Sequence, residues 1–385
     1  MKEKIFGKSR IEHSLDNQLI ISHRQHNDLV KKNRAVLKKL IDVVSFLGTH
    51  ELSFRGHDES STSTNRGNYV DLISLISRHD SLLMSHLEQS TVFRGTSNHI
   101  QYNLISAIGT VVLEKIKLEI KQARFVSIVL DETTDITNVS QLSAVLRYLT
   151  ADGIKERFLG FIEVTGARTA DSLYKIVCEI IKHYECTDKL VVQSYDGAAV
   201  MAGHLGGLQA KWITISAQIS SRFGNFDNLK FIELCNFRDF QHKAISEDGL
   251  QSLMLHYGNY FEIVALRSQL SVVSVTEDTN TKTSASELLN FLNEMDLNKA
   301  YSEVVKLCEL IVTIPATSAS VERSFSVLKR IKNFVRNSSK EDRLSNLAVL
   351  SIGKDLLKEI SEYPRFYDDV IAEFSKNIYA IYANR

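Results

Sequence analysis

Residues 124–131 read Arg-Phe-Val-Ser-Ile-Val-Leu-Asp and continue as Glu-Thr-Thr-Asp-Ile-Thr. The apolar run from Phe125 to Leu130 is too short for a typical helix and is rich in β-branched residues, so it predicts a buried strand. The run ends at a carboxylate, Asp131. Open α/β sheets bind their ligands where the strands end, so we expect Asp131 to lie at a functional edge of a sheet.

A second apolar stretch, residues 189–195, ends in the same way at Asp196. The Gly197-Ala198-Ala199 sequence that follows leaves room for another group to approach the backbone closely. Two buried strands that each end in Asp are typical of a sheet that holds a divalent metal ion. The alternative is that each acid only caps the turn it starts, and for one such strand alone this would be the better interpretation.

The order of the elements indicates the type of sheet. We expect strands at 125–130, 141–150 and 154–164, with Asp152-Gly153 as a hairpin turn, then a helix at 170–183 and a fourth strand at 189–195. Three strands in a meander followed by a parallel fourth are the ribonuclease-H-like arrangement. The prediction is therefore an α/β fold, a mixed sheet flanked by helices, with its first and fourth strands as parallel neighbours.

Hydrophobic periodicity predicts helices on both sides of this core, at 26–47, 69–87, 99–122, 316–335 and 341–362. We expect five segments. They are a disordered leader (1–22), a helical N-terminal region (23–122), a ribonuclease-H-like core with a shortened helical insertion (123–275), a loop (276–287) and a C-terminal helical region (288–385).

Composition limits the classes of function. The formal net charge is zero and the pI is about 7.2, so DNA contacts would depend on the local basic stretches 24–39 and 323–343, which could equally be solvated helix faces. The four cysteines show no zinc-binding spacing. No signal peptide and no run of eighteen apolar residues occurs, so we expect a reduced, intracellular protein without a membrane span.

A two-metal phosphoryl-transfer site needs a third carboxylate. Glu322 is the candidate, one turn into the helix that follows Pro315. It is not part of a capping box, because position 319 is Ala. The alternative is a surface acid favoured by the helix dipole. If Glu322 is not the third ligand, Asp135 is the alternative candidate, and Glu132 is a weaker candidate.

Longer motifs resemble known families. The residues Ala-Thr-Ser-Ala-Ser-Val-Glu-Arg-Ser-Phe-Ser (316–326), with Arg-Leu-Ser-Asn-Leu (343–347), resemble the C-terminal dimerisation region of hAT-superfamily transposases. A second group of motifs resembles the hAT-like domain of unknown function in MYM-type zinc-finger proteins. These motifs are Arg55-Gly56-His57, Asp131-Glu-Thr-Thr-Asp135, Gln141-Leu142, Arg147-Tyr148 and Asp196-Gly197-Ala198. Together the matches cover most of 24–212 and 300–360.

The resemblance implies a ribonuclease-H-like fold in which two Asp and one Glu bind Mg²⁺ or Mn²⁺ for DNA strand cleavage and transfer. The family motifs match Asp131, Asp196 and Glu322 in this chain. The physical chemistry agrees, because carboxylate oxygens are the ligands that hard cations prefer. The resemblance further implies a nuclear protein that forms a homodimer through its C-terminal helices.

The chain departs from the family in three respects. It contains no zinc-finger spacing, its span between Asp196 and Glu322 is shorter than the family's helical insertion, and it has no Cys-x-x-His. Trp212 could be taken for the insertion's base-stacking aromatic, but a core residue is the better interpretation. We therefore expect a domesticated, dimerising transposase relative that is catalytically weakened or inactive, has no cofactor if inactive, and does not transpose DNA. The alternatives are an active metal-dependent transposase or nuclease, and an unrelated structural or adaptor protein.

Overall fold

The computed structural model describes residues 3–60, 62–90, 93–134, 140–164, 170–195, 226–235, 245–276, 279, 282, 284–332 and 341–383. Side chains are described for all of these except residues 3–16, 134, 170–172, 195, 226–228, 341 and 378–383. The chain forms two compact units, one of residues 1–112 with 349–385 and the other of residues 113–348. Helices α4 and α14 each contribute residues to both units.

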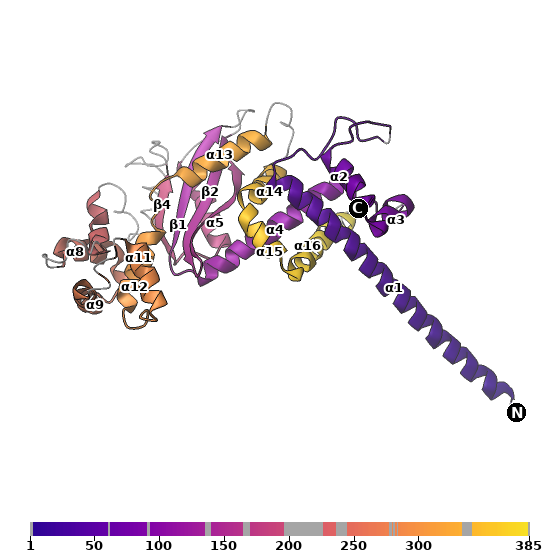
Figure 1. Ribbon diagram of the computed structural model, residues 1–385, viewed down its shortest axis with the longest axis horizontal. Coiled ribbons are helices and arrows are strands. Elements are labelled where there is room, and N and C mark those ends of the chain that lie inside the picture. The colour runs from indigo at the N-terminus through magenta and orange to yellow at the C-terminus, as the bar shows by residue number, and fades with distance from the viewer. Residues whose placement is uncertain are drawn as a thin grey trace. The chain divides into compact units, whose positions relative to one another are not determined.

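The second unit is built on a four-stranded mixed sheet (Figure 1). Its strands lie in the order β3-β2-β1-β4. The β1–β2 and β2–β3 pairs are antiparallel and the β1–β4 pair is parallel. The strands are β1 (Val126–Thr134), β2 (Ser140–Thr150), β3 (Gly153–Glu163) and β4 (Leu190–Tyr195). The predicted ribonuclease-H-like mixed sheet, with its first and fourth strands as parallel neighbours, is confirmed.

The β2–β3 hairpin has the predicted Asp-Gly turn. Gly153 has a φ of 103°, a conformation that glycine adopts without steric strain. Farther along the hairpin the register shifts between Ala144 and Val145, so that β3 bulges. At this bulge Gly160 has a φ of 155°, and the Ser345 hydroxyl of α14 lies where a Cβ would be and accepts a hydrogen bond from the Phe161 amide. The bulge thus allows α14 to approach the sheet closely.

Strand β1 is longer than its apolar run predicts. It continues to Thr134, because Glu132 to Thr134 pair with the first residues of β2. Asp131 therefore lies within β1, opposite Ser143, and the prediction that it ends the strand is wrong. In the described residues the last pair of the parallel ladder with β4 is Leu130–Tyr195, and Asp131 comes directly after it in β1. Pairing with β2 overrides the polar character of the sequence here.

Helix α4 (Asn98–Gln122) covers one face of the sheet. The Tyr148 hydroxyl of β2 donates a hydrogen bond to Glu119 Oε2 at 2.9 Å, and Arg157 of β3 forms an ion pair with the same carboxylate. Burial raises the pKa of the Tyr148 phenol and the Glu119 carboxylate raises it further, so the phenol remains a donor. Helix α5 (Ala170–His183) buries an amphipathic stripe, and Glu185 after it pairs with Lys117 of α4 at 3.0 Å.

The β1–β4 end of the sheet continues into a helical core. Phe125, Val191 and Val192 share one apolar cluster with the helices of this region, which gather beside β4 in Figure 1. These helices are η1 (Phe226–Cys235), α8 (Glu247–Tyr257), η3 (Gly258–Tyr260), α9 (Ile263–Val275), α11 (Ala285–Glu294) and α12 (Ser302–Thr313). The Gln269 side chain caps the N-terminus of the last helix of this region, α12, by accepting a hydrogen bond from the Glu303 amide at 2.9 Å.

The first unit is helical, and its described elements include α1 (Glu3–Thr49), α2 (Asn68–Ser77), α3 (Ser81–Gln89), α15 (Lys354–Ser361) and α16 (Pro364–Ala383). The structure differs from the prediction of a disordered leader at 1–22, because α1 is helical from Glu3. Most apolar residues of α1 from Val36 to Leu47 are buried, among them Leu40, Ile41 and Val44, and no Gly or Pro interrupts the chain between Gly7 and Gly48. A helix nucleated there can propagate toward the N-terminus at little further cost.

Two predicted helices are each divided in the structure. The stretch 69–87 breaks before Asp80, whose side chain caps α3 by accepting the Leu83 amide at 2.8 Å. The stretch 341–362 breaks at Gly353, between α14 (Glu341–Ile352) and α15. The predicted C-terminal region, 288–385, is not one unit either, because residues 288–348 belong with the sheet and 349–385 with the N-terminal helices. None of the helices that the structure describes is both long and apolar enough to span a bilayer.

The Tyr148–Glu119 contact gives a stability prediction. Replacing Tyr148 with Phe leaves the buried Glu119 oxygen one donor short, and a hydrogen bond to a charged group contributes about 2 kcal/mol. We expect Y148F to lower the urea midpoint measured by circular dichroism. The control is Y363F, at a tyrosine that is 64% exposed, and its midpoint should equal that of the wild type. Equal midpoints for Y148F and the wild type would contradict the prediction.

Candidate metal centre on the α13 face of the sheet

Asp131 projects from the sheet face that α13 (Ala319–Ile331) covers. Asp131 lies opposite Ser143 in the regular β1–β2 register, and side chains directly opposite each other in an antiparallel pair share a face. The Ser143 hydroxyl is 2.7 Å from the hydroxyl of Ser324 on α13. Figure 1 shows α13 lying across the sheet, on the side of this contact. The Asp131 carboxyl group is half-buried, and its Oδ1 accepts a hydrogen bond from the Glu132 amide at 2.8 Å.

Helix α13 is held on the sheet by its apolar stripe. Val321 and Leu328 are buried, and the Phe325 ring stacks on Phe161 of β3 with centroids 6.2 Å apart. Glu322 lies two positions before Ser324 on the same helix. Its side chain is exposed, and its Oε1 accepts a hydrogen bond from the Ser318 hydroxyl at 2.9 Å. Glu322 is therefore a surface acid in the first turn of a helix that crosses the Asp131 face.

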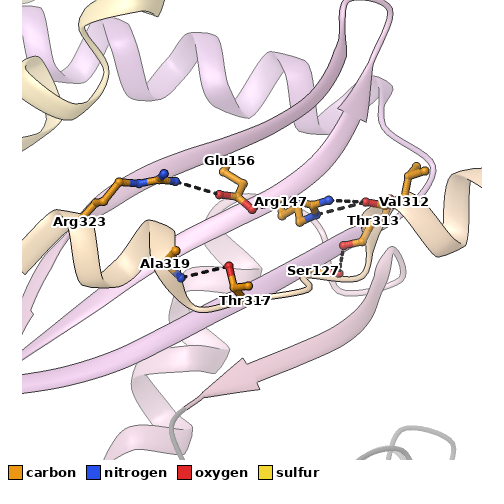
Figure 2. A network of polar contacts seen from close by, with 8 residues as sticks. All are labelled: Ser127, Arg147, Glu156, Val312, Thr313, Thr317, Ala319 and Arg323. Carbon is orange, nitrogen blue, oxygen red and sulfur yellow. Dashed lines mark hydrogen bonds and ion pairs between the residues drawn. The ribbon is translucent and has the colours of Figure 1, made fainter. Parts of the chain in front are cut away.

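The turn that leads into α13 is pinned to the sheet by two polar residues of β1 and β2 (Figure 2). The Ser127 hydroxyl donates to the Thr313 carbonyl at 2.8 Å. The Arg147 guanidinium donates to the Val312 carbonyl through Nε at 3.2 Å and through Nη2 at 2.8 Å. The last carbonyls of a helix lack partners within the helix, and a cation near them is favourable. Ser127 and Arg147 thus satisfy the end of α12 and fix where α13 begins.

A carboxylate extends this anchor to α13. Glu156 of β3 accepts Arg147 Nη1 at 2.6 Å, and Arg323 of α13 approaches its other oxygen at 3.8 Å (Figure 2). In the turn itself the Ala319 amide donates to Thr317 Oγ1 at 3.4 Å. Two ion pairs in series, Arg147–Glu156 and Glu156–Arg323, therefore link β2, β3 and α13. The two strands and the helix above them are thereby held in one arrangement.

Two of the three predicted ligands belong to β1 and to the helix above it. Asp131 projects toward α13, whereas Glu322, two positions before the sheet-facing Ser324, is exposed on the outer side of α13. Asp196, Asp135 and Trp212 lie outside the described residues. Within the described ranges, no group of three or more His, Cys, Asp or Glu side chains is placed to hold a metal ion. Carboxylate oxygens on this face have the donor chemistry that Mg²⁺ and Mn²⁺ prefer.

The anchoring residues were not predicted as functional from the sequence. Ser127 and Ser143 interrupt apolar strands, and a buried hydroxyl in such a run signals a specific partner. Arg147 was noted only as part of a motif. Its partners Val312 and Glu156 are 165 and 9 positions away, so the network is apparent only after folding.

The sheet order, the parallel β1–β4 pair and the α13 helix define a ribonuclease-H-like protein. Comparison with known families agrees with this class. Residues 9–207, more than half of the 385, match the family described as "ZMYM1/FAM200, RNase-like domain". Residues 266–356 match the "hAT family C-terminal dimerisation region". The chain belongs to the ZMYM1/FAM200 RNase-like family and is a transposon-derived relative of hAT transposases, which confirms the predicted resemblance.

The anchor of the α12–α13 turn is open to a direct test. Replacing Arg147 with Met keeps the aliphatic stem but removes the donor to the Val312 carbonyl and leaves Glu156 with only the longer contact to Arg323. We expect R147M to lose about 2 kcal/mol of stability and to exchange amide hydrogens faster in residues 313–320. The control is R365M, because Arg365 is 88% exposed and pairs only within its own helix in the described structure. Unchanged exchange at 313–320 in R147M would refute the anchoring role.

Proposed function

We propose that this chain is a self-associating, transposon-derived protein in which Asp131, Asp196 and Glu322 form a weak Mg²⁺- or Mn²⁺-dependent site for DNA strand cleavage. The observation that carries the proposal is the 2.7 Å contact between Ser143 and Ser324. It supports the proposal because it fixes the helix of Glu322 over the face from which Asp131 projects. Glu322 lies about 200° around that helix from Ser324, so its exposed carboxylate must move before it meets Asp131.

Chain connectivity supports the place of Asp196 in the site. Leu130 and Tyr195 are partners in the last described pair of the parallel ladder, and the next residues in the chain are Asp131 and Asp196. Neighbouring strands lie about 4.8 Å apart. The ions of a two-metal site lie about 4 Å apart, so two carboxylates on adjacent strands suit such a pair. Bound there, the metal ions would activate a hydroxyl nucleophile and stabilise charge on the scissile phosphate.

The described contacts of two of the acids favour weak rather than efficient chemistry. The Glu322 carboxylate is exposed and accepts a hydrogen bond from Ser318 on its own helix. Oδ1 of Asp131 accepts the Glu132 amide. Both hydrogen bonds compete with coordination of a cation. Efficient phosphoryl transfer depends on preorganised positions of the charged groups, and these two groups require rearrangement before they bind a metal.

DNA contact and nuclear localisation belong to the same proposal. Arg323, Lys329 and Arg330 are exposed on α13, next to the proposed site. The N-terminal basic stretch, 24–39, is less suited to this role than its composition indicates. Three of its cations are engaged within the chain: Arg34 with Asp368, Lys39 with Asp80 and Lys38 over the Tyr367 ring. We assign phosphate contacts to α13 because it is the helix that carries Glu322, and the strength of DNA binding should fall steeply with salt.

The proposed site is tested with Mn²⁺ titrations and with labelled duplex DNA. We expect wild-type protein to bind Mn²⁺ and to nick DNA slowly. D131A and E322A should each weaken metal binding by about tenfold, which corresponds to about 1.4 kcal/mol, and should abolish nicking. The control is E294A, at an exposed acid of α11 in the same unit, and it should behave as the wild type.

Two results would overturn parts of the proposal. Absence of Mn²⁺ binding by the wild type, or equal binding by all variants, would remove the metal site. Rapid cleavage by the wild type that is lost in both D131A and E322A would make the chain an active metal-dependent nuclease or transposase. In that case the proposed site would stand, and only the proposed low activity would be wrong. Metal binding by calorimetry is measured without DNA, so it separates the site from the cleavage reaction.

A further inference from the structure

Helix α9 has an exposed apolar face. Val264, Val272 and Val275 are 82%, 50% and 76% exposed, although valine is among the residues most often buried. Their spacing of eight and three positions puts them on one side of a helix. The opposite side is buried in the helical core through Leu266, Leu270 and Val273.

The polar groups on this part of α9 are satisfied within the chain. The Ser268 hydroxyl donates to the Val264 carbonyl, and the Ser271 hydroxyl donates to the Arg267 carbonyl. The Thr276 hydroxyl just after the helix donates to the Val272 carbonyl. Arg267 is the only charged residue of α9, and both of its terminal nitrogens contact the Glu247 carboxylate at 2.6 Å. The exposed face can therefore be covered without leaving a hydroxyl or a charge unpaired.

The resemblance implies a homodimer through the C-terminal helices, but the apolar stripes of α13 and α14 are buried in the chain itself. Val321 and Leu328 of α13 and Leu344 and Leu350 of α14 are at most 2% exposed. These four side chains therefore offer no surface to a second copy. Helix α9 overlaps the start of the matched dimerisation region, 266–356, and its exposed Val272 and Val275 lie inside that region, with Val264 just before it. The self-association that the region indicates therefore needs a different surface from the one that the sequence predicts.

We infer that a second copy of this chain docks on the outer face of α9, residues 264–275, with the two α9 helices packed against each other across a two-fold axis. This inference rests on the self-association in the proposed function and names its surface. In a two-fold contact each residue meets the same patch on the other copy. A charged face would repel itself, whereas α9 is apolar and its one cation is neutralised by Glu247. Exposed valines and small serines also allow close approach of two helices.

The test compares oligomeric state by analytical ultracentrifugation at several protein concentrations. The variant is V264D/V272D, whose two positions are exposed, so the core of each chain is unchanged. Like charges brought together across an interface cost several kcal/mol, so we expect a dimer at least about a hundredfold weaker than the wild type. The control is L118D, at a leucine of α4 in the same unit that is 56% exposed and outside the dimerisation region. It should remain dimeric.

The possible outcomes test the α9 docking surface and the proposed self-association separately. A wild type and a V264D/V272D variant that dimerise equally would refute the α9 surface and leave the proposed self-association standing. Equal loss of the dimer in L118D would also refute it, because the effect would not be specific to α9. A strictly monomeric wild type would overturn both the self-association and the inference. Circular dichroism of each variant verifies that the fold is retained.

Discussion

The arrangement of the unit that contains the sheet, residues 113–348, depends on the attachment of the α12–α13 turn to the sheet. The end of α12 leaves carbonyl groups without helical partners, and Ser127 and Arg147 of adjacent strands supply the missing donors. Because these partners are buried or half-buried, losing either one would leave a desolvated polar group. The contact therefore fixes the position at which the chain leaves the helical core and crosses the sheet as α13.

This attachment also determines what the α13 face can do. Ser127, Asp131, Ser143 and Arg147 project from the same face, because each lies opposite another of them in the β1–β2 register. Arg147 and Ser127 hold the entry to α13, and Ser143 holds its middle through Ser324. These contacts hold α13 over the strand that carries Asp131, and they involve neither Asp131 nor Glu322.

The same packing changes the meaning of the dimerisation region. The apolar stripes of α13 and α14 are buried within the chain, so their hydrophobicity reports folding of one chain. Exposed valines on α9 have no such cover. Hydrophobic periodicity identifies the face of a helix that is buried, and it does not distinguish burial against the same chain from burial against another. That distinction requires the tertiary structure.

Local patterns were sufficient for the sheet: short β-branched runs for β1 and β4, an Asp-Gly turn for the β2–β3 hairpin, and the order of elements for the parallel β1–β4 pair. They also singled out Asp131 and Glu322 as candidate metal ligands, because residue type and motif are properties of the sequence. Sequence could not predict that β1 extends to Thr134, since this depends on pairing with β2. Nor could it predict that Arg147 binds a carbonyl 165 positions away. Both are contacts between segments far apart in the chain, and only folding brings such segments together.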